Sequence, residues 1–92
     1  MQRSGTLPGG RVVRKRIRVV ERKLGREGAV GLSYGDGVIE VDPRQCPFDY
    51  LDTLIHECLH EVFPDKGEED VYPAATAIAK VLWKQGFRRV DQ

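Results

Sequence analysis

The chain has 92 residues, of which 40% are hydrophobic, and its 15 Lys and Arg residues nearly balance its 14 Asp and Glu residues. A chain of this length has room for a single small core, so we expect one small domain. No apolar run approaches the roughly 20 residues of a membrane span, and the start MQRSGTLPGG lacks the apolar segment of a signal peptide. We therefore expect one cytoplasmic domain over residues 1–92 with no membrane contact.

The charges are unevenly distributed along the chain. Residues 1–30 carry nine Lys or Arg against two Glu, a net of +7, and the remaining residues carry a net of −6. The run RVVRKRIRVVERK is interpreted either as a strand with a solvated basic face or as a weak nucleic-acid contact through Arg14, Lys15, Arg16 and Arg18. Because the first aromatic residue is Tyr34, this segment offers no platform for stacking bases.

The first half of the chain is predicted to form a flexible arm followed by short strands. Residues 1–10 are polar and contain Pro-Gly-Gly, which favours an arm. Residues 12–20 alternate β-branched and basic side chains, as a strand does. Residues 31–41 contain Gly-Asp-Gly at their centre, which predicts a tight hairpin between two strands. Ile39 and Val41 should then face the same side of the sheet.

A first helix is predicted from Pro47 to about Phe63. Proline suits the first helical turn, where its missing N–H is no loss, and Pro64 cannot extend the helix. Apolar residues recur at steps of three and four and predict a buried stripe: Leu51, Leu54, Ile55, Cys58, Leu59 and Val62. The two cysteines, Cys46 and Cys58, would lie about 18 Å apart along this helix, too far for a disulfide.

The segment HECLH within this helix predicts a metal site. His56 and His60 stand one turn apart, about 5–6 Å between Cβ atoms, so both rings can reach one ion at about 2.0–2.1 Å. Glu57 lies one step round the helix, where its carboxylate can hold the ion's water. Placing two histidines and a glutamate in a small core without a ligand would be costly. We predict that His56 and His60 bind zinc and that Glu57 is a general base.

A second helix is predicted to end near Gln85, with Gly86 as its stop. Pro73 is unfavourable inside a helix that begins at Gly67, so the helix either kinks or begins near Asp70. The predicted buried stripe of this helix contains four apolar residues: Val71, Ala75, Ile78 and Leu82.

The third zinc ligand should come from the start of this second helix, since catalytic zinc sites keep three protein ligands and one water. A helical projection places Glu68 on the inward side and turns Glu69 outward. Glu68 is therefore the predicted ligand, and Glu69 and Asp65 are the alternatives. The acidic triplet from Glu68 to Asp70 is also explained by a favourable interaction with the helix dipole alone.

The segments LDTLIHECLHEVFPD, EEDV and IAKVLWKQGFR resemble those of small SprT-like, or gluzincin-like, zinc metallopeptidases of phage and prophage genomes. The resemblance covers about residues 31–89. It implies an α+β fold, with a small antiparallel sheet of about three strands followed by a HExxH helix and a C-terminal helix. The family's glutamate ligand, three residues before an apolar position, corresponds to Glu68 before Val71. Zn²⁺ as cofactor and action in a host cytoplasm are implied as well.

The activity that the resemblance implies is hydrolysis of peptide bonds in a peptide or protein substrate. Glu57 would take a proton from zinc-activated water and pass it to the leaving nitrogen. An extended peptide could add to the strand at residues 38–41 as an edge strand. Tyr72 and Tyr34 are candidates for stabilising the oxyanion.

Two other functions fit the same residues. One is a non-catalytic, zinc-stabilised binding or regulatory module that contacts nucleic acid, and the other is a hydrolase of another amide or of a phosphoester. Glu57 separates them, because holding zinc does not require it. Its presence favours catalysis over a purely structural metal site.

Overall fold

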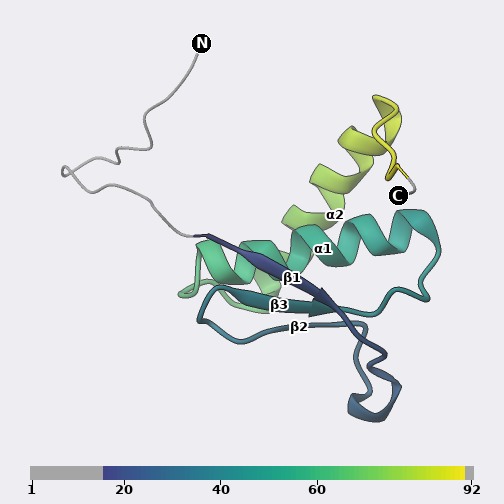
Figure 1. Cartoon of the computed structure of the whole chain (residues 1–92). Helices are drawn as coiled ribbons and strands as arrows, with labels where there is room; N and C mark the ends of the chain where they lie inside the picture. Colours follow the sequence, from purple (N-terminus) through teal and green to yellow (C-terminus); the bar gives the residue numbers. More distant parts are fainter. Residues whose placement is uncertain (1–15, 91–92) are drawn as a thin grey trace.

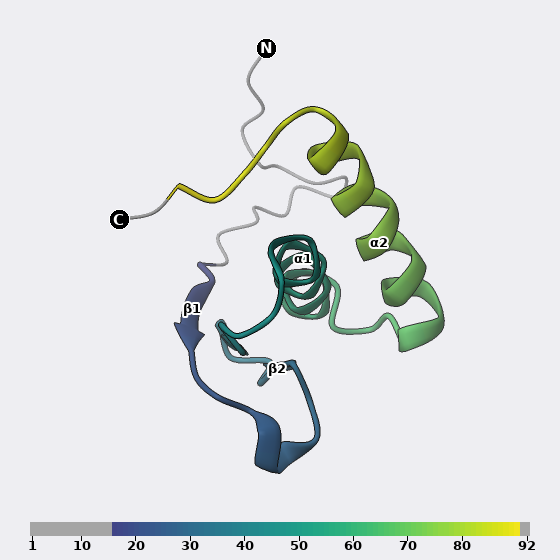
Figure 2. The ribbon, with the colours of Figure 1, turned by 90° about the vertical axis from the view of Figure 1, so that its right-hand side faces the viewer.

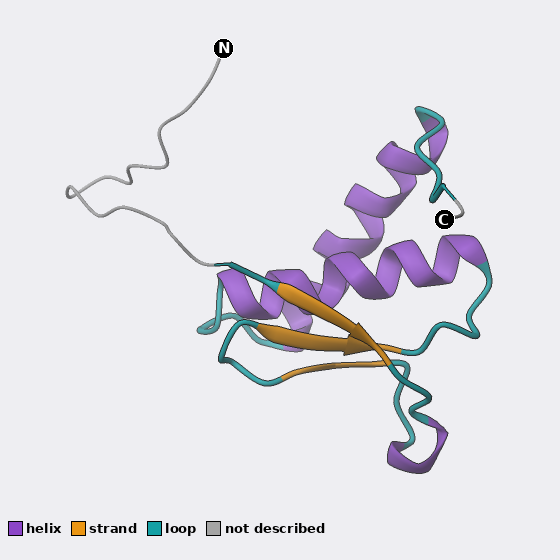
Figure 3. Ribbon diagram, in the orientation of Figure 1, coloured by secondary structure: helices purple, strands orange, loops and turns teal. Residues whose placement is uncertain are grey.

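The computed structural model describes residues 16–90 and shows a small sheet followed by two helices (Figures 1 and 3). The predicted α+β fold class is confirmed. The predicted arm at residues 1–10 lies outside the described residues, as do Arg14 and Lys15. The elements are β1 (Arg18–Glu21), the short 3-10 helix η1 (Gly25–Glu27), β2 (Gly31–Ser33), β3 (Val38–Val41), α1 (Pro47–Val62) and α2 (Glu68–Lys84).

The three strands form a mixed sheet in the order β1-β3-β2, where a wholly antiparallel sheet was expected. β2 pairs with β3 as the predicted antiparallel hairpin, whereas β1 pairs with β3 in parallel. The difference arises because residues 22–30 are a connection long enough to carry the chain past the β3 position, so β2 does not turn back onto β1. β3 is therefore the central strand, and the prediction that residues 38–41 form an edge strand is wrong.

The hairpin between β2 and β3 has the predicted geometry. Gly35 and Gly37 adopt positive φ angles of 80° and 91°, which side chains with a Cβ rarely allow. Ile39 and Val41 are fully buried and share one face of the sheet, as predicted. That face is covered by α1.

The described part of the chain forms three layers, with α1 between the sheet and α2 (Figure 2). α1 begins at Pro47, as predicted, and its last residue is Val62, directly before the predicted end near Phe63, but its buried residues are Thr53, Glu57 and Glu61. The predicted apolar stripe is only half-buried, and Val62 is 42% exposed. The prediction assumed a helix with one buried side. α1 instead packs on two sides, and its polar row Thr53, Glu57 and Glu61, at the spacing i, i+4, i+8, faces the sheet.

α2 runs without interruption from Glu68 and contains Pro73 in its second turn. It ends as predicted: Gly86 has a φ of 90°, and the Phe87 N–H donates to the Leu82 carbonyl at 3.0 Å. Val71 and Ala75 are buried, as predicted, together with Ala79, but Ile78 is 42% exposed. Ile78 lies at the border of the side that faces α1, so the prediction that it is buried is wrong.

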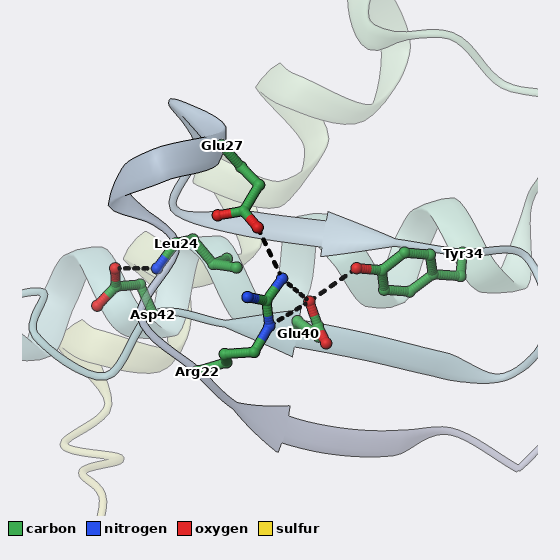
Figure 4. Close-up of polar contacts among 6 residues, drawn as sticks. All are labelled: Arg22, Leu24, Glu27, Tyr34, Glu40 and Asp42. Atoms are coloured by element: carbon green, nitrogen blue, oxygen red, sulfur yellow. Dashed lines mark hydrogen bonds and ion pairs between the residues drawn. The ribbon is translucent and has the colours of Figure 1, made fainter.

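The face of the sheet that points away from α1 carries polar networks that fasten the strands together (Figure 4). Arg22 donates to Glu40 at 2.9 Å and to Glu27 at 3.0 Å, and the Tyr34 hydroxyl donates to Glu40 at 2.7 Å. These bonds hold the pKa of Glu40 below its ordinary value, chiefly through Arg22. The charge of Arg22 is thus satisfied within the fold.

Asp42, directly after β3, forms hydrogen bonds with two separate parts of the chain, the segment that precedes η1 and the residues that follow β3. It is 3% exposed, accepts the Leu24 N–H at 2.9 Å and pairs with Arg44 at 2.7 Å. The Arg44 guanidinium, followed by the two backbone N–H donors, holds the pKa of Asp42 well below its usual range. Leu24 is thereby fixed in the core although it lies outside any strand or helix.

Among residues 16–90, no helix combines the length and apolar character needed to cross a membrane. Cys46 and Cys58 are both free thiols, as the predicted spacing along α1 required.

Candidate metal centre

One carboxylate group contacts both histidines of the HECLH segment. The Glu68 Oε1 atom lies 2.9 Å from His56 Nε2, and Glu68 Oε2 lies 3.0 Å from His60 Nε2. The two imidazole rings stand 4.9 Å apart between centroids, on successive turns of α1. The predicted ligand atoms all lie within 4.8 Å of one another.

The first turn of α2 brings Glu68 to this position because α2 folds back across α1 after the short connection at residues 63–67. Glu69 points elsewhere: its Oε1 atom stands 2.7 Å from where a Cβ at Gly67 would be. Asp65 is exposed in the connection and does not belong to the group. Of the three acidic residues weighed for the third ligand, the structure brings Glu68 to the histidines.

The chemistry of the donors fits a zinc ion. Two imidazole nitrogens and one carboxylate oxygen are the ligand types of three-ligand zinc sites, which leave a fourth position for water or substrate. The two histidine side chains are 16% and 20% exposed, and that of Glu68 is 68% exposed, so the group is accessible from solvent.

Glu57 lies beside this group and is 8% exposed. Burial raises the pKa of its carboxyl group above the ordinary value, against the opposing influence of His56 and His60. Its carboxylate makes no hydrogen bond in the described part of the chain. A largely buried carboxylate without a fixed partner is suited to accept and release a proton.

A cavity of about 560 Å³ opens next to Glu57, His56 and Glu68. Tyr72 lines it and sets its ring edge-on to His56, 5.9 Å between centroids. Tyr34 lies instead on the opposite side of the sheet, bonded to Glu40. Of the two tyrosines weighed for the oxyanion, only Tyr72 reaches the cavity, so the Tyr34 alternative is wrong.

Sequence reasoning missed two further carboxylates in this cavity, Asp49 and Asp52. Asp52 accepts hydrogen bonds from the Thr76 hydroxyl at 3.0 and 3.2 Å, which joins α1 to α2 below the candidate ligands. Their spacing offered a signal, since Asp49, Asp52 and His56 fall on one side of a helix at steps of three and four. Among the described residues, the cavity is lined by no Lys or Arg, so the charges of its lining favour cations.

Glu61, the residue after His60, was also missed. It is fully buried and accepts hydrogen bonds from the Ser33 hydroxyl at 2.5 Å and from the N–H groups of Gly35 and Gly37 at 2.6 and 2.8 Å. These bonds fasten the turn of the β-hairpin to the helix that carries both histidines. The position of β2 relative to the candidate ligands therefore depends on Glu61.

Comparison of the chain with protein-family models, with curated proteins and with solved structures found no match. The resemblance to SprT-like metallopeptidases accordingly stays a prediction from the sequence.

Proposed function

We propose that this protein is a zinc-dependent metallopeptidase that hydrolyses peptide bonds with Glu57 as general base. The observation that carries the proposal is the meeting of Glu68 with the Nε2 atoms of both His56 and His60, beside a cavity lined by Glu57. A purely structural zinc site is usually closed by four protein ligands, whereas this group has three and adjoins open space.

In this reaction the ligands, the general base and the oxyanion donor would be different residues. His56, His60 and Glu68 would hold the zinc, which would supply Lewis acidity and lower the pKa of a bound water toward neutral. Glu57 would accept a proton from the attacking water and pass it to the leaving nitrogen, a role that the pKa of its buried carboxyl group, raised above the ordinary value, favours. Tyr72 lines the cavity with its ring against His56, and it would donate a hydrogen bond to the carbonyl oxygen as negative charge develops there.

The open edge of β2 offers a place for an extended substrate. The Tyr34 N–H donates to the Val38 carbonyl, and the Asp42 N–H donates to the Val30 carbonyl. Backbone hydrogen bonds alternate along an antiparallel pair, so the N–H and carbonyl groups of Gly31 and Ser33 point toward the free edge of β2. Gly31 also lines the cavity. A peptide that adds to this edge would pass the candidate ligands, and β2 thus takes the role first expected of β3.

The decisive experiment compares Glu57→Gln with His60→Ala in a protein-cleavage and peptide-library assay of the zinc-loaded chain. Glu57→Gln should keep its zinc and lose at least about a hundredfold in rate. It should be at least as stable as wild type without metal at neutral pH, because the folded state raises the pKa of Glu57 and so disfavours its charged form. His60→Ala should lose zinc and activity together.

Two outcomes would overturn the proposal. Loss of zinc from Glu57→Gln would make Glu57 a ligand or a structural partner. A zinc-loaded wild type that cleaves no peptide or protein would leave the zinc-stabilised binding module as the better assignment.

A nucleic-acid contact is a second, accessory proposal, and it rests on Arg16 and Arg18. Both side chains are exposed beside or on the edge strand β1, and neither forms an ion pair with any residue from 16 to 90. Replacing both with Gln should weaken binding to duplex DNA. It should also reduce the slope of log affinity against log salt concentration by the equivalent of about two phosphate contacts. Arg22→Gln is the control, since Arg22 is engaged by Glu27 and Glu40. Salt-independent binding, or none at low salt, would contradict this contact.

A further inference from the structure

α2 carries a second apolar stripe on its exposed surface. Ala74, Ala77, Ile78 and Val81 follow the spacing i, i+3, i+4, i+7 of one helix face, and all four are exposed. Ile78 is 42% exposed and Val81 is 60% exposed. By the rotation of about 100° per residue, the centre of this stripe lies more than 90° from buried Ala75. The helix is thus apolar on more of its surface than packing against α1 requires.

Within the described part of the chain, nothing covers this stripe. α1 is the only element that packs against α2, and Figure 2 shows α2 as the outermost layer, with its far side open. An exposed apolar stripe at regular helical spacing is the surface that a partner helix would bury. The charges at its two ends indicate which helix that is.

Asp70 lies one turn before the stripe, and Lys84 lies about one turn after it. Within residues 16–90, neither side chain forms an ion pair or a hydrogen bond. A second α2 running in the opposite direction would bring Asp70 of each copy next to Lys84 of the other. A parallel copy would place like charges together, so the charge pattern matches an antiparallel copy of the same helix.

We propose that this stripe is a homodimer interface in which two α2 helices pack antiparallel about a two-fold axis between Ala77 and Ile78. Such an interface is self-complementary: Ala74 of one copy faces Val81 of the other, and Ala77 faces Ile78. The two alanines permit close approach of the helices. Glu68 and Tyr72 project from other sides of α2, so dimerisation leaves the candidate metal centre open. The proposal does not depend on the peptidase assignment.

The interface is small compared with a standard protein–protein interface, and the dimer should therefore be reversible. Sedimentation equilibrium of the full chain should show mostly monomer near about 1 µM and increasing dimer toward about 300 µM, as expected for a dissociation constant of tens of micromolar. Ile78→Lys should weaken association at least about tenfold. Val62→Lys is the matched control, because Val62 on α1 is also 42% exposed, and it should leave association unchanged. Circular dichroism of each variant reports folding.

Disulfide trapping tests the orientation, in a chain whose native thiols are removed by Cys46→Ser and Cys58→Ser. Ala77→Cys should oxidise readily to a covalent dimer. Asp70→Cys mixed with Lys84→Cys should cross-link to each other, and Asp70→Cys alone should not. A chain that stays monomeric at every concentration, an Ile78→Lys variant that associates like wild type, or efficient Asp70→Cys self-linking would each overturn the proposal.

Discussion

The side chain of Glu57 packs directly against the backbone of Gly31. A Cβ atom added at Gly31 would stand 2.9 Å from both Cγ and Oε2 of Glu57, and 2.5 Å from Cγ2 of Thr53. β2 can therefore approach α1 only because residue 31 has no side chain. This close approach places the proposed general base beside the proposed substrate edge.

Gly31→Ala should displace β2 from α1 and disturb Glu57. Because Thr53 and Glu57 are buried and cannot move aside freely, we expect a loss of about 1–3 kcal/mol in the free energy of unfolding. Urea denaturation measures this loss, and zinc affinity should change little. Gly28→Ala is a useful comparison, since a Cβ there meets nothing within 4 Å and only the φ of 67° opposes it. Equal stability of Gly31→Ala and wild type would contradict the close contact.

The acidic residues of the α2 first turn should differ sharply in metal binding. Glu68→Gln should lower zinc affinity at least about tenfold, because it weakens a ligand that faces both histidines. Glu69→Gln and Asp65→Asn, the two alternatives, should retain wild-type affinity. Competition with a chromophoric chelator measures all three. Should Glu69→Gln lose zinc while Glu68→Gln keeps it, the ligand set would be wrong.

Glu61 should be essential for stability although it belongs to neither the ligands nor the apolar core. Glu61→Ala leaves two backbone N–H groups of the hairpin turn without their acceptor, at a cost of about 2–4 kcal/mol. Thermal unfolding of metal-free protein measures this cost. Asp65→Ala, an exposed acidic residue of the neighbouring connection, is the control. A Glu61→Ala variant as stable as the control would show that the hydrogen bonds of Glu61 to Gly35 and Gly37 do not stabilise the hairpin.

Asp42 should make a large contribution to acid sensitivity. Its folded-state pKa is depressed, chiefly by Arg44 and then by backbone donors, so its stabilisation is fully present above the ordinary pKa of about 3.9. The contribution is lost as the pH falls below that value toward the folded-state pKa. Asp42→Asn should therefore have a lower melting temperature than wild type at pH 7, and the difference should narrow by about pH 3. A difference independent of pH would contradict this assignment.

Features that depend on neighbours along the chain could be predicted without the structure. The four-residue step places His56 and His60 on one side of any helix, and Pro47 and Pro64 limit that helix by their missing N–H groups. The Gly-Asp-Gly segment likewise predicted the hairpin, because only glycine adopts its positive φ angles without strain. These are local steric and hydrogen-bonding requirements, which hold in any fold.

Contacts between distant segments were decided only by tertiary packing. β1 pairs in parallel with β3 because of how the connection at residues 22–30 crosses the sheet, which alternation of side chains cannot reveal. α1 buries Thr53, Glu57 and Glu61 because the sheet and α2 cover two different sides of it, while periodicity assumed a single apolar side. The helical projection already favoured Glu68 over Glu69 and Asp65. That the Glu68 carboxylate lies within 3.0 Å of both histidines depends on how α2 packs against α1, which the sequence alone does not give.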